Sequence, residues 1–128
     1  MLKPTYETIV IGAGPAGSTS AKILAQNGVD VLLIEKRKEV GNPPHCAGYV
    51  SKLLNFYINI NKRCIVQEIE KMRTYFPSGK NHETNVSSYI VERGLFDKFL
   101  AIEAVKAGAK LLVNTTAVGL LKKDEKIK

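Results

Sequence analysis

Apolar residues form two short runs near the N-terminus, and their pattern predicts a strand–helix–strand unit. Residues 5–11 alternate between polar and apolar positions and are rich in β-branched side chains, as in a buried strand. Residues 29–35 are apolar nearly throughout, which is typical of a strand inside a parallel sheet. A helix of small side chains, predicted to end near Gln26, joins them. Two parallel strands joined by a helix form a right-handed βαβ unit, so we expect an α/β fold.

Further along, one long amphipathic stretch predicts a second helix over residues 93–107. Its apolar side chains recur at helical spacing and predict a broad buried face; they are Leu95, Phe96, Phe99, Leu100, Ile102 and Val105. The segments around this helix predict shorter elements. They are a loop at 38–48, a short helix near 50–56, strands at 65–69 and 71–76, a turn at 77–80, a return strand ending near 91, and strands at 110–114 and 116–121.

The composition is that of one ordinary globular domain, with 128 residues, 45% of them apolar and 24% charged. No apolar run approaches the length of a membrane span and no signal peptide precedes the first strand, so we expect a cytoplasmic protein. Cys46 and Cys64 lack the spacing of a zinc site or a disulfide scaffold, and no metal is expected. The net charge of +7 is spread along the chain without a nucleic-acid motif. Nucleic acid is therefore not an expected partner, and the charge supports at most a mild attraction to phosphates or an anionic membrane surface.

The segment between the first strand and the helix carries the glycine pattern of a dinucleotide-binding turn. Gly12, Gly14 and Gly17 follow the GxGxxG spacing, with a strand before them and a helix after them. The first glycine permits the tight turn, the second lets a pyrophosphate approach the helix N-terminus, and the third lets the helix pack close to the strand. Glu35 ends the next strand, where a carboxylate accepts hydrogen bonds from ribose hydroxyls and repels a 2′-phosphate. The pattern therefore predicts a site for FAD or NAD rather than NADP.

The glycine turn, followed by Leu-Leu-Ile-Glu-Lys at 32–36, resembles the FAD fingerprint of two-dinucleotide-fold flavoproteins. A wider pattern consists of Glu-Lys-Arg-Lys-Glu-Val-Gly at 35–41, Pro-Pro-His-Cys-Ala-Gly at 43–48 and Tyr-Ile-Val-Glu-Arg-Gly-Leu-Phe-Asp at 89–97. Together these segments resemble the geranylgeranyl reductase family of flavoproteins, and archaeal digeranylgeranylglycerophospholipid reductases within it. The resemblance covers essentially all 128 residues, but only the N-terminal part of a much longer family member. It implies FAD as the cofactor and a Rossmann-like FAD-binding βαβ domain of the two-dinucleotide-binding-fold type.

The resemblance also implies which residues contact the cofactor. In chain order they are Gly12, Gly14, Ala16 and Gly17 in the phosphate loop, Glu35 at the ribose, Cys46 and Ala47 in a loop beside the flavin ring, Arg93 opening a helix and reaching the cofactor, and Ala117, whose backbone reads the adenine edge. Family members often carry a glycine three residues after this cysteine, where this chain has Tyr49. The resemblance therefore implies a flavin pocket that differs from the family's at this position.

Cys46 is the one candidate for a catalytic residue, and two interpretations of it stay open. It either packs the loop as a small apolar side chain or lies beside the isoalloxazine ring, in contact with flavin or substrate. Only His45, its neighbour in sequence, offers a base next to it. Cys64, which precedes a predicted strand, is expected to be an inert thiol.

The reaction that the resemblance implies is hydrogenation of isolated carbon–carbon double bonds in geranylgeranyl chains. Reduced FAD would deliver hydride to one carbon while a proton reaches the other, and the protein would orient the substrate, exclude water and supply that proton. The substrate would be an unsaturated archaeal membrane glycerophospholipid precursor, which implies peripheral contact with the membrane surface. An external electron donor, such as a ferredoxin or NAD(P)H, would reduce the flavin.

Two other functions stay open from the sequence. An FAD-dependent monooxygenase or halogenase shares the glycine turn, the ribose carboxylate and the helix-opening arginine, although the loop at 43–48 argues against it. A split or inactive fragment would at most bind FAD. Residues 122–128 have the composition of a hairpin that begins a return strand, and the family's later FAD motif and substrate domain have no counterpart. We therefore expect a truncated fold, in which residues 1–128 are the N-terminal part of an FAD-binding domain and a complementary C-terminal polypeptide is needed for activity.

Overall fold

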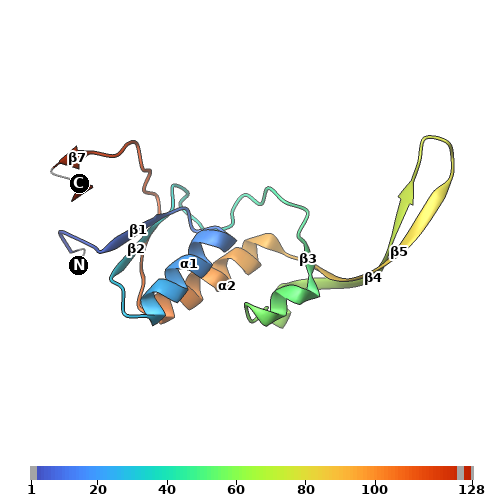
Figure 1. Ribbon diagram of the computed structural model, residues 1–128, viewed down its shortest axis with the longest axis horizontal. Coiled ribbons are helices and arrows are strands. Elements are labelled where there is room, and N and C mark those ends of the chain that lie inside the picture. The colour runs from blue at the N-terminus through green and yellow to red at the C-terminus, as the bar shows by residue number, and fades with distance from the viewer. Residues whose placement is uncertain (1–2, 124–125, 128) are drawn as a thin grey trace. The chain divides into compact units, whose positions relative to one another are not determined.

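The structure is a computed structural model that describes residues 3–123 and 126–127 (Figure 1). The chain divides into two compact units. Unit 1 comprises Met1–Asn42 and Asp97–Lys128, and unit 2 comprises Pro43–Phe96. Among the described residues, no helix is long and apolar enough to cross a membrane.

Unit 1 is built on a three-stranded parallel sheet with the strand order β1-β2-β6. The strands are β1 (Thr8–Ile11), β2 (Val31–Ile34) and β6 (Lys110–Leu112). Helix α1 (Pro15–Gln26) joins β1 to β2 and confirms the predicted βαβ unit. Each strand is shorter than predicted because the flanking residues do not enter the ladder between strands.

The core of unit 1 is made largely of small side chains. Its members are Ala13, Ala21, Val31, Leu33, Val40, Ala101, Ala104 and Ala109, and Figure 1 shows α1 and α2 (Arg93–Lys106) on the same side of the sheet. The predicted buried face of α2 is partly wrong, because Leu95, Ile102 and Val105 are 41%, 47% and 46% exposed. Alanines fill that role because a helix face of small side chains can approach a sheet closely, which turns the larger apolar side chains outward.

Unit 2 is an antiparallel sheet with the order β3-β5-β4. The strands are β3 (Tyr49–Ser51), β4 (Ile65–Tyr75) and β5 (Asn81–Val91), with two 3₁₀ helices, η1 (Lys52–Phe56) and η2 (Lys62–Cys64). The two strands predicted at 65–69 and 71–76 are therefore one strand. Shifts of register within β4, one of them between Ile69 and Lys71, break its apolar alternation in two.

Strands β4 and β5 continue together past β3 as a two-stranded ribbon (Figure 1). Every residue from 70 to 85 is exposed. Glu83 joins the two strands of the ribbon through ion pairs with Lys71 at 2.7 Å and Arg73 at 2.9 Å. The predicted turn at 77–80 connects the strands.

The last part of the chain differs in one respect from its prediction. Residues 113–121 form no strand, so the strand predicted at 116–121 is wrong. An extended segment becomes a strand only when a neighbouring strand satisfies its backbone groups, and in the described part of the chain no strand pairs with residues 116–121. The predicted hairpin is confirmed, since β7 (Lys122–Lys123) pairs antiparallel with β8 (Lys126–Ile127). Its turn, residues 124–125, lies outside the described residues.

Candidate nucleotide-binding site

The glycine turn after β1 has a backbone that other residues could not adopt. Gly12 has a φ of +97°, in the left-handed region, and its N–H donates to the carbonyl oxygen of Ile34 at 2.7 Å. A Cβ on Gly17 would lie 1.9 Å from the carbonyl oxygen of Gly12. The first and third glycines therefore perform the roles that their spacing predicts, a tight turn and a close approach of α1 to β1.

The N-terminus of α1 leaves room for an anion. Gly14 is the N-cap residue, Pro15 opens the helix, and among the described residues no side chain caps this end. A Cβ on Gly14 would meet nothing within 4 Å, and Ala16 is exposed. Uncapped N–H groups and the helix dipole favour negative charge here, so the arrangement fits a pyrophosphate.

Glu35 is held in place by the backbone on either side of it. Its two carboxylate oxygens accept hydrogen bonds from the N–H groups of Ala13 at 2.9 Å and Arg37 at 3.0 Å. Each carboxylate oxygen has two lone pairs, so both oxygens retain capacity to accept a bond from a hydroxyl group. The carboxylate is thus fixed and half-buried without being saturated.

A cavity of about 270 Å³ lies at the carboxyl ends of all three parallel strands. Two backbone hydrogen bonds join the segment after β6 to the segment after β2: Thr115 N–H donates to the Glu35 carbonyl oxygen at 2.9 Å, and Asn114 N–H donates to the Arg37 carbonyl oxygen at 2.8 Å. Ligands of open α/β sheets bind at this edge. The lining residues are Ile11, Gly12, Ile34, Glu35, Lys36, Thr115, Thr116 and Ala117.

This cavity brings together three of the predicted residues, Gly12, Glu35 and Ala117. The sequence prediction missed Thr115 and Thr116, which flank Ala117 on the segment after β6. The available signal was their position, since residues that follow the end of a parallel strand face the same edge as Gly12 and Glu35.

Outside the glycine turn, the remaining predicted cofactor residues are Cys46, Ala47 and Arg93, which lie in unit 2. Cys46 and Ala47 are exposed on an irregular loop, and half-buried Arg93 is the first residue of α2. Gly48 ties this loop down: it has a φ of +83°, and a Cβ there would lie 2.1 Å from the carbonyl oxygen of Val91. The loop that carries Cys46 is therefore fixed at its end by the strand that leads into α2.

Cys64 behaves as the inert thiol that the sequence predicts. Its side chain is fully buried, and its Sγ–H donates to the Asn61 carbonyl at 2.8 Å. Burial raises the pKa of the Cys64 thiol, which keeps it in its unreactive neutral form.

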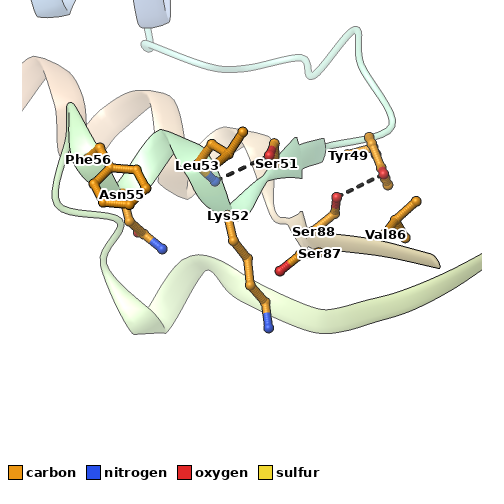
Figure 2. Close-up of a pocket in the computed structure, with 9 residues that line it drawn as sticks. All are labelled: Tyr49, Ser51, Lys52, Leu53, Asn55, Phe56, Val86, Ser87 and Ser88. Atoms are coloured by element: carbon orange, nitrogen blue, oxygen red, sulfur yellow. Dashed lines mark hydrogen bonds between the residues drawn. The ribbon is translucent and has the colours of Figure 1, made fainter.

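Unit 2 also carries an open hollow of about 710 Å³ that the sequence did not predict (Figure 2). Its apolar surface comes from exposed or half-buried side chains on η1 and the neighbouring strands. The Ser88 hydroxyl donates to the Tyr49 hydroxyl at 2.8 Å, and Lys52 pairs with Glu68 at 2.5 Å. The lining residues are Tyr49, Ser51, Lys52, Leu53, Asn55, Phe56, Val86, Ser87 and Ser88.

Comparison with known proteins shows what this chain is similar to. Residues 5–56 match the family described as FAD binding domain. A digeranylgeranylglycerophospholipid reductase from Methanosarcina acetivorans is 43% identical over 99% of this chain and 33% of its own length. The crystal structure of a geranylgeranyl bacteriochlorophyll reductase-like protein from Thermoplasma acidophilum has a TM-score of 0.88 and 39% identity, over 95% of this chain and 33% of that one.

In sequence, the chain matches the N-terminal third of the geranylgeranyl reductase family. It spans about a third of the length of these two relatives. A myxobacterial chondrochloren halogenase shares the fold with a TM-score of 0.76 and 22% identity, over 95% of this chain and 31% of the halogenase chain. The α/β fold with a parallel sheet is that of an FAD-binding domain, and FAD is the cofactor that the family match supports.

Proposed function

We propose that this chain is the nucleotide-binding part of an FAD-dependent oxidoreductase of the geranylgeranyl reductase type. The reaction is hydrogenation of carbon–carbon double bonds in the geranylgeranyl chains of archaeal membrane glycerophospholipid precursors. The observation that carries the proposal is the cavity at the ends of β1, β2 and β6, where backbone amides hold the carboxylate of Glu35. The matched relatives, named digeranylgeranylglycerophospholipid reductases, support the substrate.

The residues of unit 1 fit the adenosine and pyrophosphate portions of FAD. Glu35 accepts hydrogen bonds from ribose hydroxyls, and its charge disfavours a 2′-phosphate at that position. The backbone at Ala117 contacts the adenine edge. The pyrophosphate lies against the N-terminus of α1, where Gly14 leaves space and Ala16 contributes an N–H group.

In unit 2, Cys46, Ala47 and Arg93 are proposed to contact the flavin part of the cofactor. Bound FAD, once reduced, supplies two electrons to the double bond as a hydride. The protein orients the double bond, excludes water and delivers a proton to the second carbon. Cys46 is our candidate for a residue beside the reacting atoms, since its loop is exposed and anchored at Gly48.

We also propose the partners of the reaction. They are an isoprenoid glycerophospholipid as substrate, a ferredoxin or NAD(P)H as electron donor, and a complementary C-terminal polypeptide. We propose that residues 1–128 are the N-terminal part of an FAD-binding domain, because the reductase relative and the solved reductase-like structure match over only a third of their length.

Titration of the chain with FAD tests the nucleotide site, with flavin fluorescence and visible absorbance as readouts. We expect saturable binding that Glu35→Gln weakens by roughly tenfold to a hundredfold, since a hydrogen bond to a charged group contributes about 1.5–3 kcal/mol. The matched control is Glu70→Gln, which removes an exposed carboxylate in unit 2 and should leave affinity unchanged. Equal affinities of both variants, at equal melting temperatures, would refute the assignment of Glu35.

A second experiment tests the reaction itself. The C-terminal two thirds of the Methanosarcina acetivorans relative is supplied as a separate polypeptide, together with FAD, a reductant and a digeranylgeranylglycerophospholipid. We expect the lipid to gain two hydrogens per reduced double bond by mass spectrometry, and expect no gain with either polypeptide alone. FAD binding without any reduction in the mixture would leave the chain a cofactor-binding fragment.

A further inference from the structure

Unit 1 carries a second hollow, lined by α2, by residues 38–40 and by Leu111 of β6. It has a volume of about 370 Å³. The floor is apolar, and Ile102 and Val105 are 47% and 46% exposed. We call it the lysine groove; its lining residues are Lys38, Glu39, Val40, Lys98, Ala101, Ile102, Val105, Lys106 and Leu111.

The charged side chains around the lysine groove are mainly positive. Three lysines and one glutamate line it, which leaves an excess of two positive charges. Lys98 pairs with Glu39, and Lys106 pairs with Glu103 at 3.1 Å. Both lysines lie on the same stripe of α2 as Ile102 and Val105, at positions three to four residues apart. The surface therefore combines exposed apolar side chains with flanking lysines.

We propose that the lysine groove docks unit 1 onto an anionic lipid surface. Ile102 and Val105 enter the boundary between headgroups and acyl chains, while the ammonium groups of Lys38 and Lys106 contact lipid phosphates. This distribution is the one that interfacial helices use, because a lysine stem covers apolar surface while its charge stays in the headgroup layer. Each lysine near an anionic leaflet strengthens binding about fivefold.

Charge complementarity favours lipid over a second copy of this chain. A symmetric dimer through the lysine groove would place the same excess of positive charge on both sides of the contact, which is repulsive. An anionic leaflet instead neutralises it. The inference rests on the proposed function for the membrane contact that its lipid substrate implies, but it uses neither the cavity at Glu35 nor the loop at Cys46.

Flotation with lipid vesicles tests the proposal on the full 128-residue chain. We expect binding to phosphatidylglycerol vesicles, little binding to phosphatidylcholine vesicles, and loss of binding at about 0.5 M salt. The double variant Lys38→Glu/Lys106→Glu should bind about 25-fold more weakly or worse. Its control is Lys62→Glu/Lys80→Glu, which makes the same change in net charge at exposed positions of unit 2 and should weaken binding less than about threefold.

Substitutions of two valines separate the contribution of apolar insertion to vesicle binding from the contribution of charge. Val105→Ser should weaken binding severalfold, whereas Val66→Ser, at a position 68% exposed in unit 2, should have no effect. Circular dichroism of each variant establishes that the fold is kept. FAD titration runs beside the flotation assay, so a chain that floats without binding FAD refutes the proposed function and leaves the docking surface standing.

Three outcomes would overturn the lysine groove as a docking surface. The first is absence of binding to anionic vesicles. The second is an equal loss in both double-lysine variants, which would mean that only net charge matters. The third is a change in self-association of the Val105→Ser variant by sedimentation velocity with vesicle binding intact, which would assign the groove to a second copy of the chain.

Discussion

The two units are stabilised by different interactions. Unit 1 has strands of only three or four residues, yet it holds most of the buried apolar side chains in the described part of the chain. Unit 2 has two strands of 11 residues each, and its buried apolar residues are Ile60, Cys64, Val91 and Phe96. Burial of apolar side chains stabilises unit 1, whereas a long ladder of hydrogen bonds between strands accounts for much of the stability of unit 2.

This difference has a consequence for where a rigid site can be built. The cavity at Glu35 has walls made of backbone that is clamped at several points. The hollow in Figure 2 instead leaves Phe56 83% and Leu53 66% exposed. A two-stranded ribbon without a core is marginal by itself, so we expect unit 2 to open before unit 1.

The largest effect should come from filling the closest backbone approach in each unit. Gly17→Ala places a methyl group 1.9 Å from the Gly12 carbonyl oxygen, and Gly48→Ala places one 2.1 Å from the Val91 carbonyl oxygen. Backbone atoms cannot give way cheaply, so each substitution should cost at least about 3 kcal/mol. Hydrogen exchange read by mass spectrometry should show lost protection in α1 for the first and in β5 for the second.

The comparison would fail if either glycine variant lost protection in both units equally. That result would mean that the two units fold as one cooperative block. Gly119→Ala is the control for both, because a Cβ there meets nothing within 4 Å.

A smaller effect separates cofactor binding from folding within unit 1. Gly14→Ala adds a methyl group that meets no atom of the chain within 4 Å, so the melting temperature should barely change. The same methyl group occupies space proposed for the pyrophosphate, and FAD affinity should fall about tenfold or more. Unchanged affinity in the FAD titration would refute the proposed position of the pyrophosphate at this helix end.

The buried Cys64 thiol of unit 2 predicts that the stability of the fold depends on pH. The pKa of Cys64 is raised by burial, so its contribution to stability is complete below the pKa of an exposed thiol, about 8.5, and is lost as pH rises toward the folded value. Stability should fall by at most about 1.4 kcal/mol per pH unit in that window. Urea titrations at pH 8 and pH 10 measure this loss, and Cys64→Ala should lack it.

The smallest effect belongs to the exposed ribbon. Glu83→Gln removes the carboxylate that pairs with Lys71 and Arg73, whose positive charges hold the pKa of Glu83 below its ordinary value. Exposed ion pairs contribute little, so the melting temperature should stay the same. Only amide exchange at residues 71–75 should quicken, and a drop in global stability would show that the ribbon supports more than itself.

Features that depend on residues close together in the sequence could be predicted. Contacts between residues far apart in the sequence could not. The turn at Gly12 and the carboxylate of Glu35 follow from spacing, because a short turn and the end of one strand decide both. The buried face of α2 was misjudged, since pattern reasoning gives weight to large side chains such as Ile102 while Ala101 and Ala104 carry the contact. Thr115 was missed because only the order of strands in the sheet brings it to Glu35.

The two cysteines differ in exposure, and this difference makes it possible to measure the transient opening of unit 2. Cys46 is exposed, whereas Cys64 is fully buried behind a hydrogen bond to Asn61. A thiol-specific dye should therefore label the chain in two phases, the first at the rate of an accessible sulfhydryl. The second phase proceeds only through molecules in which unit 2 has transiently opened, so its rate reports the free energy of that opening without any denaturant.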